Sequence, residues 1–333
     1  MRKIKLSALD LATVCKGQNA QQAIARSVEA AQHIEKLGYQ RIWFAEHHNM
    51  EHIASSATAV LIGHVAGKTN HIRIGSGGIM LPNHSPLVVA EQFGTLETLY
   101  PGRIDLGLGR APGTDQVTAM ALRRNNLNTA FYFKDDVLAL HQYFENDNPS
   151  EKVRAFPGEG LAIPIYILGS STDSAHLAAE LGLPYAFAAH FAPAMLAQAS
   201  DIYRNNFKPS RYLQEPYFIA CVNIIGAETT DEADFLATSL HNMFAGIITN
   251  YRRPLSPPTE QVIYHGIPEI EKAVYSMTAC TFTGDKETLT QSIDDFATRY
   301  QVDEIMTTNY IYDNAKRLES FRIIKEALLE KHD

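Results

Sequence analysis

The chain has few cysteines, a single tryptophan and no excess of basic charge. Its three cysteines, Cys15, Cys221 and Cys280, lie far apart and form no Cys-x-x-Cys spacing, which excludes a disulfide framework and a zinc knuckle. Acidic and basic residues are mixed along a chain of net charge −8, so no basic stripe is available for a phosphate backbone or an anionic membrane. We therefore expect reduced thiols, and neither nucleic acid nor a membrane as a partner.

Long apolar runs are also missing. Residues 1–11 are basic and then alternating, without the continuous apolar region of a signal peptide, and no run reaches the length of a transmembrane helix. We therefore expect a cytoplasmic protein. The composition, with 45% hydrophobic and 20% charged residues, is that of a globular protein with a substantial core.

Short apolar runs alternate with amphipathic stretches along the whole chain. This alternation, repeated about eight times, predicts an α/β fold with a parallel sheet. We predict a single (β/α)8 TIM-barrel domain over residues 1–333, a length that this fold accommodates. The expected strands are Ile4–Leu9, Arg41–Ala45, Ile72–Gly77, Ile104–Leu108, Ile165–Leu168, Tyr185–Ala188, Tyr217–Ile225 and Glu304–Thr307.

Helix signals and interruptions complete this pattern. Residues 23–37 show apolar spacing near 3.6, and Gly38 is placed to end that helix. Residues 146–163 and 246–277 are rich in proline, glycine or charge, which predicts two insertions into the barrel. The second insertion is either a lid or a surface excursion.

Polar residues follow the second expected strand, where a TIM barrel carries its chemistry. Glu46, His47 and His48 come directly after an apolar run, which favours a functional site over a lone structural histidine. With His52 they are also zinc-ligand types, but the helical His-Glu-x-x-His order is absent. We expect no metal.

The residues at the ends of the third and fourth expected strands are glycines and an arginine. Gly75, Gly77 and Gly78 allow a ligand to pass close to the main chain, although a glycine-rich bulge gives the same pattern. Arg110 follows the fourth strand, where a guanidinium suits a phosphate. The alternative for Arg110 is a structural salt bridge to Glu46 or Asp115.

The fifth strand runs into hydroxyl-bearing residues at a helix start. Ser170, Ser171 and Ser174 fit either an anion site or ordinary helix capping. Because Arg110 would lie beside this turn, the two together favour a phosphorylated cofactor. No Gly-x-Gly-x-x-Gly, Walker or Gly-x-Ser-x-Gly motif occurs, which argues against those nucleotide-binding and hydrolase classes.

These motifs resemble one family along nearly the whole chain. Residues 43–48 (WFAEHH), 75–82 (GSGGIMLP), 101–107 (PGRIDLG) and 170–172 (SST) are similar, in order and spacing, to the luciferase-like flavin-dependent monooxygenases, in particular their bacterial YhbW-type branch. The resemblance implies a barrel, usually a homodimer, that binds FMN at its C-terminal mouth and takes it reduced from a separate reductase.

The resemblance also implies roles for single residues. His47 matches a histidine beside the flavin that acts in proton transfer, and Gly77-Gly78 matches a pair joined by a cis peptide under the ring. The positions that match the phosphate site are Arg110, Ser170, Ser171 and Ser174. His190, after the sixth strand, would border the flavin or the substrate.

Two departures weaken a transfer of luciferase activity itself. Bacterial luciferase has a glutamate where this chain has Ser170 and a reactive cysteine where it has Gly109, so light emission is not implied. We also expect Leu9, Phe44, Ile79 and Phe191 to line a dry cavity at the flavin.

The functional hypothesis is a two-component monooxygenase that uses reduced FMN and O2 on a small organic substrate. Two rivals stay open. One is hydride transfer with the deazaflavin F420 in the same superfamily, and the other is a flavin-binding protein without catalysis.

Overall fold

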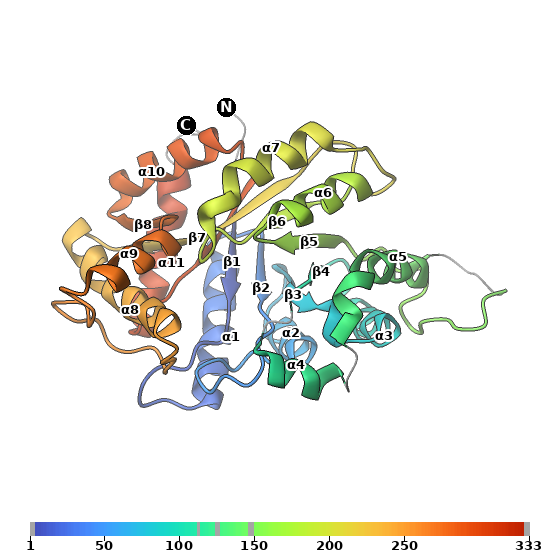
Figure 1. Cartoon of the computed structure of the whole chain (residues 1–333), viewed down its shortest axis with the longest axis horizontal. Helices are drawn as coiled ribbons and strands as arrows, with labels where there is room; N and C mark the ends of the chain where they lie inside the picture. The colour runs from blue at the N-terminus through green and yellow to red at the C-terminus, as the bar shows by residue number, and fades with distance from the viewer. Residues whose placement is uncertain (1–3, 112–113, 124–126, 146–149, 330–333) are drawn as a thin grey trace.

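The computed structural model describes residues 4–111, 114–123, 127–145 and 150–329, and these form a closed parallel barrel surrounded by helices (Figure 1). Hydrogen bonding follows the order β6-β5-β4-β3-β2-β1-β9-β7, and pairing of β6 with β7 closes the ring. The predicted (β/α)8 TIM barrel is therefore confirmed. The strands are β1 Lys5–Asp10, β2 Arg41–Phe44, β3 Arg73–Met80, β4 Ile104–Gly109, β5 Ile165–Gly169, β6 Tyr185–Phe187, β7 Phe218–Gly226, β8 Thr281–Gly284 and β9 Glu304–Thr308.

A ninth strand, β8, lies outside the closed ring. It pairs only with the C-terminal part of β7, from Asn223 to Gly226, while β9 pairs with the part from Ile219 to Asn223. The eight predicted strands correspond to the eight barrel strands, and β8 was missed. Three of its four residues are only half-buried, so its sequence lacks the apolar run of a barrel strand.

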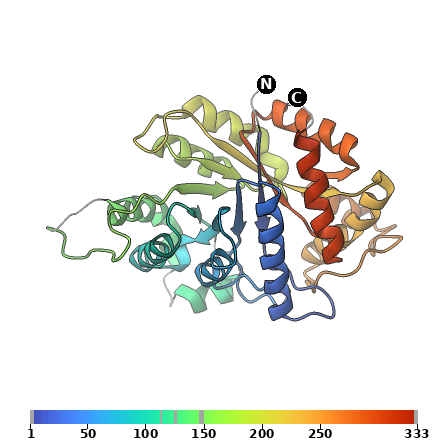
Figure 2. The same cartoon turned by 180° about the vertical axis from the view of Figure 1, so that it is seen from behind.

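Helices cover the outside of the barrel. The first, α1, begins at a capping box in which Asn19 and Gln22 exchange side-chain hydrogen bonds with each other's backbone N–H. It ends before Gly38, whose φ of +73° is favourable only for glycine, as predicted. Figure 2 shows α1 and α11 side by side. The α-helices are α1 Ala20–Lys36, α2 Thr58–Ala66, α3 Pro86–Leu99, α4 Gln116–Arg123, α5 Phe133–Phe144, α6 Thr172–Leu181, α7 Leu196–Asn206, α8 Thr230–Ile248, α9 Pro268–Met277, α10 Lys286–Arg299 and α11 Asn314–Leu329.

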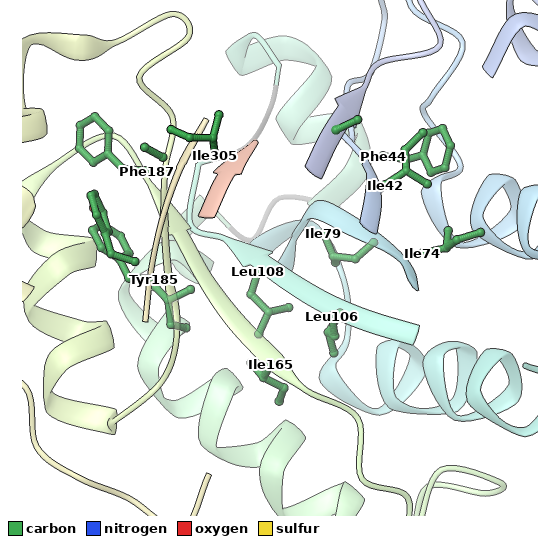
Figure 3. Packing of buried hydrophobic residues seen from close by; sticks show 14 of the residues in the cluster. Ile42, Phe44, Ile74, Ile79, Leu106, Leu108, Ile165, Tyr185, Phe187 and Ile305 are labelled. Atoms are coloured by element: carbon green, nitrogen blue, oxygen red, sulfur yellow. The ribbon is translucent and has the colours of Figure 1, made fainter. Parts of the chain in front are cut away.

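The core has two layers because strand side chains alternate between the outer and inner faces of the barrel. The outer layer packs strands against helices and includes Phe44 and Ile79 (Figure 3). The inner layer includes Leu9 and Trp43. The expectation that Phe44 and Ile79 line a central cavity is therefore wrong, because Trp43 takes the inward position and Phe44, the next residue, points outward.

Ion pairs fill the N-terminal half of the barrel interior. The guanidinium of Arg41 lies 2.7 Å from a carboxylate oxygen of Asp105 and 2.9 Å from one of Glu304, and all three side chains are buried. Arg73 adds a second cation 2.6 Å from Asp105. Tyr166 accepts a hydrogen bond of 2.6 Å from Arg41. Because these side chains fill the N-terminal half of the barrel interior, a ligand inside the barrel has room only at the C-terminal ends of the strands.

The second predicted insertion lies at that C-terminal end. Residues 249–267 connect α8 to α9, and Leu255 pairs with Cys15 in the loop after β1. Figure 1 shows this loop at the lower edge of the molecule, beside the β1–α1 loop. Of the first predicted insertion, residues 146–149 lie outside the described residues, and residues 150–163 form an arm that extends away from the barrel before β5 (Figure 1).

The barrel-filling ion pairs generate a stability prediction. Arg41→Met should lower the free energy of unfolding by about 3–5 kcal/mol, since it leaves two buried carboxylates uncompensated. Arg322→Met removes an arginine that is 38% exposed and paired at the surface, and should cost no more than about 1 kcal/mol. Urea unfolding of both variants measures the difference; equal losses would contradict the account.

Candidate functional site

A buried carboxylate organises the loop after β2. Glu46 is 1% exposed, and its side chain accepts hydrogen bonds from His48 at 2.8 Å, His84 at 2.9 Å and the backbone N–H of Met80 at 3.0 Å. Asn83 also lies 3.4 Å from it. Glu46 therefore ties the end of β2 to the end of β3.

The electrostatics of Glu46 fit a structural anion. Burial favours the neutral acid and raises its pKa, but the hydrogen bonds from His48 and His84 outweigh burial and hold the pKa of Glu46 at about 2. His48 and His84 are thus engaged by this carboxylate. Among the described residues, no group of three or more metal-ligating side chains has the geometry to hold a metal ion.

Three other imidazoles come together at the mouth of the barrel. His47 is half-buried, and after burial its charge contributes to the lowered pKa of both His52 and His190. His190 is 7% exposed; burial, followed by His47, lowers its pKa to about 3, so it is neutral at pH 7. A hydrogen bond with the backbone of Cys221 partly opposes this shift. The Nδ1 atom of His190 is buried and has no hydrogen-bond partner among the described residues.

Asn223 on β7 holds the His190 loop, and this residue was not among the predicted site residues. Its amide nitrogen donates to the backbone carbonyl of His190 at 2.7 Å and to Thr281 Oγ1 at 3.0 Å. Thr308 on β9 donates to the Asn223 carbonyl oxygen at 2.5 Å. A single asparagine inside an apolar strand was the available signal, because a buried amide must be hydrogen-bonded.

Near its C-terminal end, β3 contains two consecutive residues without side chains, Gly77 and Gly78. The peptide bond between Gly77 and Gly78 is cis, as the resemblance implies, and the strand register shifts between Ser76 and Ile79. A methyl group on Gly77 would meet Leu9 at 2.6 Å, and one on Gly78 would meet the carbonyl oxygen of Gly107 at 2.7 Å. Packing within the barrel therefore requires glycine at both positions. The peptide between them consequently has no side chain on either residue.

Arg110 forms a different ion pair from the one expected. Its guanidinium lies 3.0 Å from Asp173 in the first turn of α6, instead of pairing with Glu46 or Asp115. Glu46 is occupied by His48 and His84, and Asp115 caps its own turn through Thr118. The pair does confirm that Arg110 lies beside the turn after β5.

The turn of Ser170, Ser171 and Ser174 leaves the start of α6 uncapped. Ser171 is the N-cap residue, and its side chain makes no capping hydrogen bond. The hydroxyl of Ser174 donates to the Ser171 carbonyl at 2.8 Å and lies 3.0 Å from the Tyr185 hydroxyl. The ordinary capping interpretation is therefore wrong for Ser171, and N–H groups at this helix start remain available to an anion.

The 249–267 segment brings one more cation to the mouth. Arg252 Nη1 lies 3.7 Å from the Met50 sulfur, and burial, followed by the charge of Arg252, lowers the pKa of His52. Phe191, on the opposite side after β6, is 43% exposed. The mouth thus has an imidazole region flanked by this segment, and Arg110 with the α6 start lies at the ends of β4 and β5.

A family comparison identifies the chain. The model of the luciferase-like monooxygenase family matches residues 4–300. The chain belongs to the luciferase-like monooxygenase family. A luciferase-like monooxygenase of Escherichia coli K12 is 48% identical over 98% of this chain and 99% of its own length. The N-acetyl-S-alkylcysteine monooxygenase of Bacillus subtilis is 30% identical over 98% of both chains.

Two solved structures share the fold of this chain. The structure of apo-MsnO8 is 31% identical to this chain, with a TM-score of 0.88 over 97% of this chain and 98% of that one. The FMN complex of a type II Baeyer–Villiger monooxygenase from Pseudomonas putida, at 16% identity and TM-score 0.74, shows likeness of fold alone. Among the described residues, no helix has the length and apolar character needed to span a membrane.

The buried state of His190 makes stability depend on pH. Its pKa is about 3 in the folded chain and ordinarily 6.5, so the unfolded chain binds more protons between these values and stability falls as pH falls below 6.5. When the pH falls from 7 to 5, the free energy of unfolding should fall in both proteins. The fall should be about 2 kcal/mol smaller in His190→Gln than in the parent protein.

Urea unfolding at both pH values measures this difference. His71→Gln, at an exposed position, serves as the matched control and should follow the parent protein. An unchanged pH dependence in His190→Gln would show that His190 has the same pKa in the folded and the unfolded chain, which contradicts the account.

Proposed function

We propose that this protein is an FMN-dependent monooxygenase that uses reduced FMN and O2 to oxygenate a small organic substrate. The observation that carries the proposal is the pairing of an uncapped helix start with Arg110, at the same barrel mouth as the bare Gly77-Gly78 peptide and the His47–His190 pair. The family supplies the monooxygenase class, and the neighbouring FMN complex supports the choice of flavin.

The phosphate end of FMN would lie at the start of α6. Arg110 and Asp173 are 48% and 66% exposed, so their ion pair contributes little and a phosphate can replace the carboxylate at small cost. The guanidinium then offers two parallel donors to phosphate oxygens, and N–H groups of the uncapped turn add to them. Ser170 and Ser171 supply hydroxyls at the same place.

The ring of FMN would lie against the Gly77-Gly78 peptide, on which Leu9 and Trp43 also pack. Reduced FMN, when bound, would supply the electrons that activate O2. In this proposal, His47 would hold or deliver a proton there. His190 stays neutral and offers an unpartnered Nδ1 as a hydrogen-bond acceptor. Its burial also helps to keep water away from the reacting atoms.

The substrate and partners are part of the proposal. The Bacillus subtilis relative acts, by its name, on N-acetyl-S-alkylcysteine, which makes such thioethers the first substrates to assay. A separate reductase would supply reduced FMN, and we propose a homodimer. Exposed apolar side chains on α2 and α3, Val60 at 74% and Val88 at 43%, favour an interface on those helices.

Anaerobic titration with FMN and reduced FMN tests the cofactor assignment. Trp43 is the only tryptophan and lies beneath Gly77, so its fluorescence should be quenched when a flavin binds. Tighter binding of reduced FMN, followed by an oxygen-dependent transient in stopped-flow mixing, supports the monooxygenase. Binding of F420 without FMN supports hydride transfer, and flavin binding without any oxygen reaction supports a carrier.

Arg110→Gln should separate phosphate binding from ring binding. Loss of a charge-assisted contact should weaken FMN about ten- to a hundred-fold. Riboflavin, which has the same ring but no phosphate, should bind both proteins equally. Arg211→Gln, at an exposed arginine paired with Glu145, is the control. Equal losses for FMN and riboflavin would contradict a phosphate role for Arg110.

His47→Asn should impair the oxygen reaction while sparing FMN. Removal of a positioned proton donor should lower the yield of oxygenated product per O2 about tenfold or more, with hydrogen peroxide released instead. The dissociation constant of FMN should stay within about twofold, since His47 is not placed at the phosphate. His64→Asn, at an exposed position, is the control. Loss of FMN binding would reassign His47 to a structural role.

A further inference from the structure

A small polar cavity lies between β1, β9 and α1. Its volume is about 20 Å³, enough for one water-sized particle. Residues that line it include Asp10, Cys15, Arg26, Leu255, Asn309 and Arg317. Leu255 closes it from the side of the 249–267 segment.

The charges around this cavity do not balance. Arg26 and Arg317 are each 8% exposed, and Asp10 is the only carboxylate among the lining residues. Asp10 lies 2.9 Å from Arg317 and also accepts a hydrogen bond from the backbone of Ala12 at 2.7 Å. Among the described residues, Arg26 has no carboxylate within ion-pair distance. One positive charge is therefore buried without a counter-ion.

The contacts of Arg26 are to neutral groups. One nitrogen donates to the Ile311 carbonyl at 3.0 Å, and another lies 2.5 Å from the Cys15 sulfur and 3.3 Å from the Gln18 side chain. Burial raises the pKa of the Cys15 thiol, so Cys15 does not supply the missing negative charge. A buried, unpaired charge is costly unless an anion accompanies it.

We propose that this cavity binds one small monovalent anion of chloride size between Arg26 and Arg317. Monovalency matches the single excess charge, and the small volume favours a single small ion. Asn309 Oδ1 is buried without a hydrogen-bond partner, which makes a water molecule the competing occupant. The proposal does not depend on the flavin assignment.

The anion would strengthen the attachment of the 249–267 segment. Leu255 accepts a hydrogen bond from Lys16 N–H at 2.8 Å and donates one to the Val14 carbonyl at 2.9 Å, next to the cavity. Arg26 comes from α1 and Arg317 from α11, so one ion would link both helices beneath this segment. Binding of chloride or another halide would thus stabilise the barrel mouth.

Two measurements on the full chain test the anion site. Thermal unfolding at constant ionic strength, with chloride replacing gluconate up to about 200 mM, should raise Tm by about 2–4 °C. Arg26→Gln should abolish this dependence, and Arg322→Gln, a surface arginine on α11, should retain it. Crystals of the parent protein soaked in bromide should show an anomalous peak between Arg26 and Arg317.

Two other results would overturn the anion proposal. A chloride-independent Tm, together with bromide soaks that show only a water-like peak, would overturn the proposal even if Arg26→Gln fails to fold. Thiolate absorbance near 240 nm that disappears in Cys15→Ser would assign the counter-charge to Cys15 and overturn it as well.

Discussion

The ion pairs of Arg41 with Asp105 and Glu304 are the constraint on which the site depends. They begin at the first residues of β2 and β9, and they fill the barrel interior where a TIM barrel otherwise stacks apolar layers. Trp43 lies above them and donates a hydrogen bond to Asp105 at 3.0 Å. The glycine peptide of β3 packs on Trp43. Any ligand must therefore bind above this filled half.

The histidines at the C-terminal end of the barrel are of two kinds, which differ in their hydrogen-bond partners. His48 and His84 hydrogen-bond to Glu46, which joins two strand ends into one rigid rim. Burial, followed by the charge of His47, lowers the pKa of His190, and the Nδ1 atom of His190 has no hydrogen-bond partner among the described residues. The hydrogen-bond partner thus distinguishes the two imidazoles that hold the rim from the buried imidazole of His190.

The sequence predicted the barrel and its eight strands because buried parallel strands are continuous apolar runs. The sequence also predicted correctly that Arg110 lies beside the Ser170–Ser174 turn, because neighbouring parallel strands end at the same rim of the barrel. It failed where partners come from distant segments: Asp173 as the partner of Arg110, Asn223 behind His190, and the inward or outward direction of Phe44. β8 was missed because half-buried residues leave no clear period.

A crystal structure of the protein with FMN tests the central claim most directly. The account predicts phosphate oxygens within hydrogen-bond distance of Arg110 and the first turn of α6, with the flavin ring against Gly77 and Gly78 and next to His47. A phosphate bound at another strand end, or a ring that stays away from the Gly77-Gly78 peptide, would contradict it.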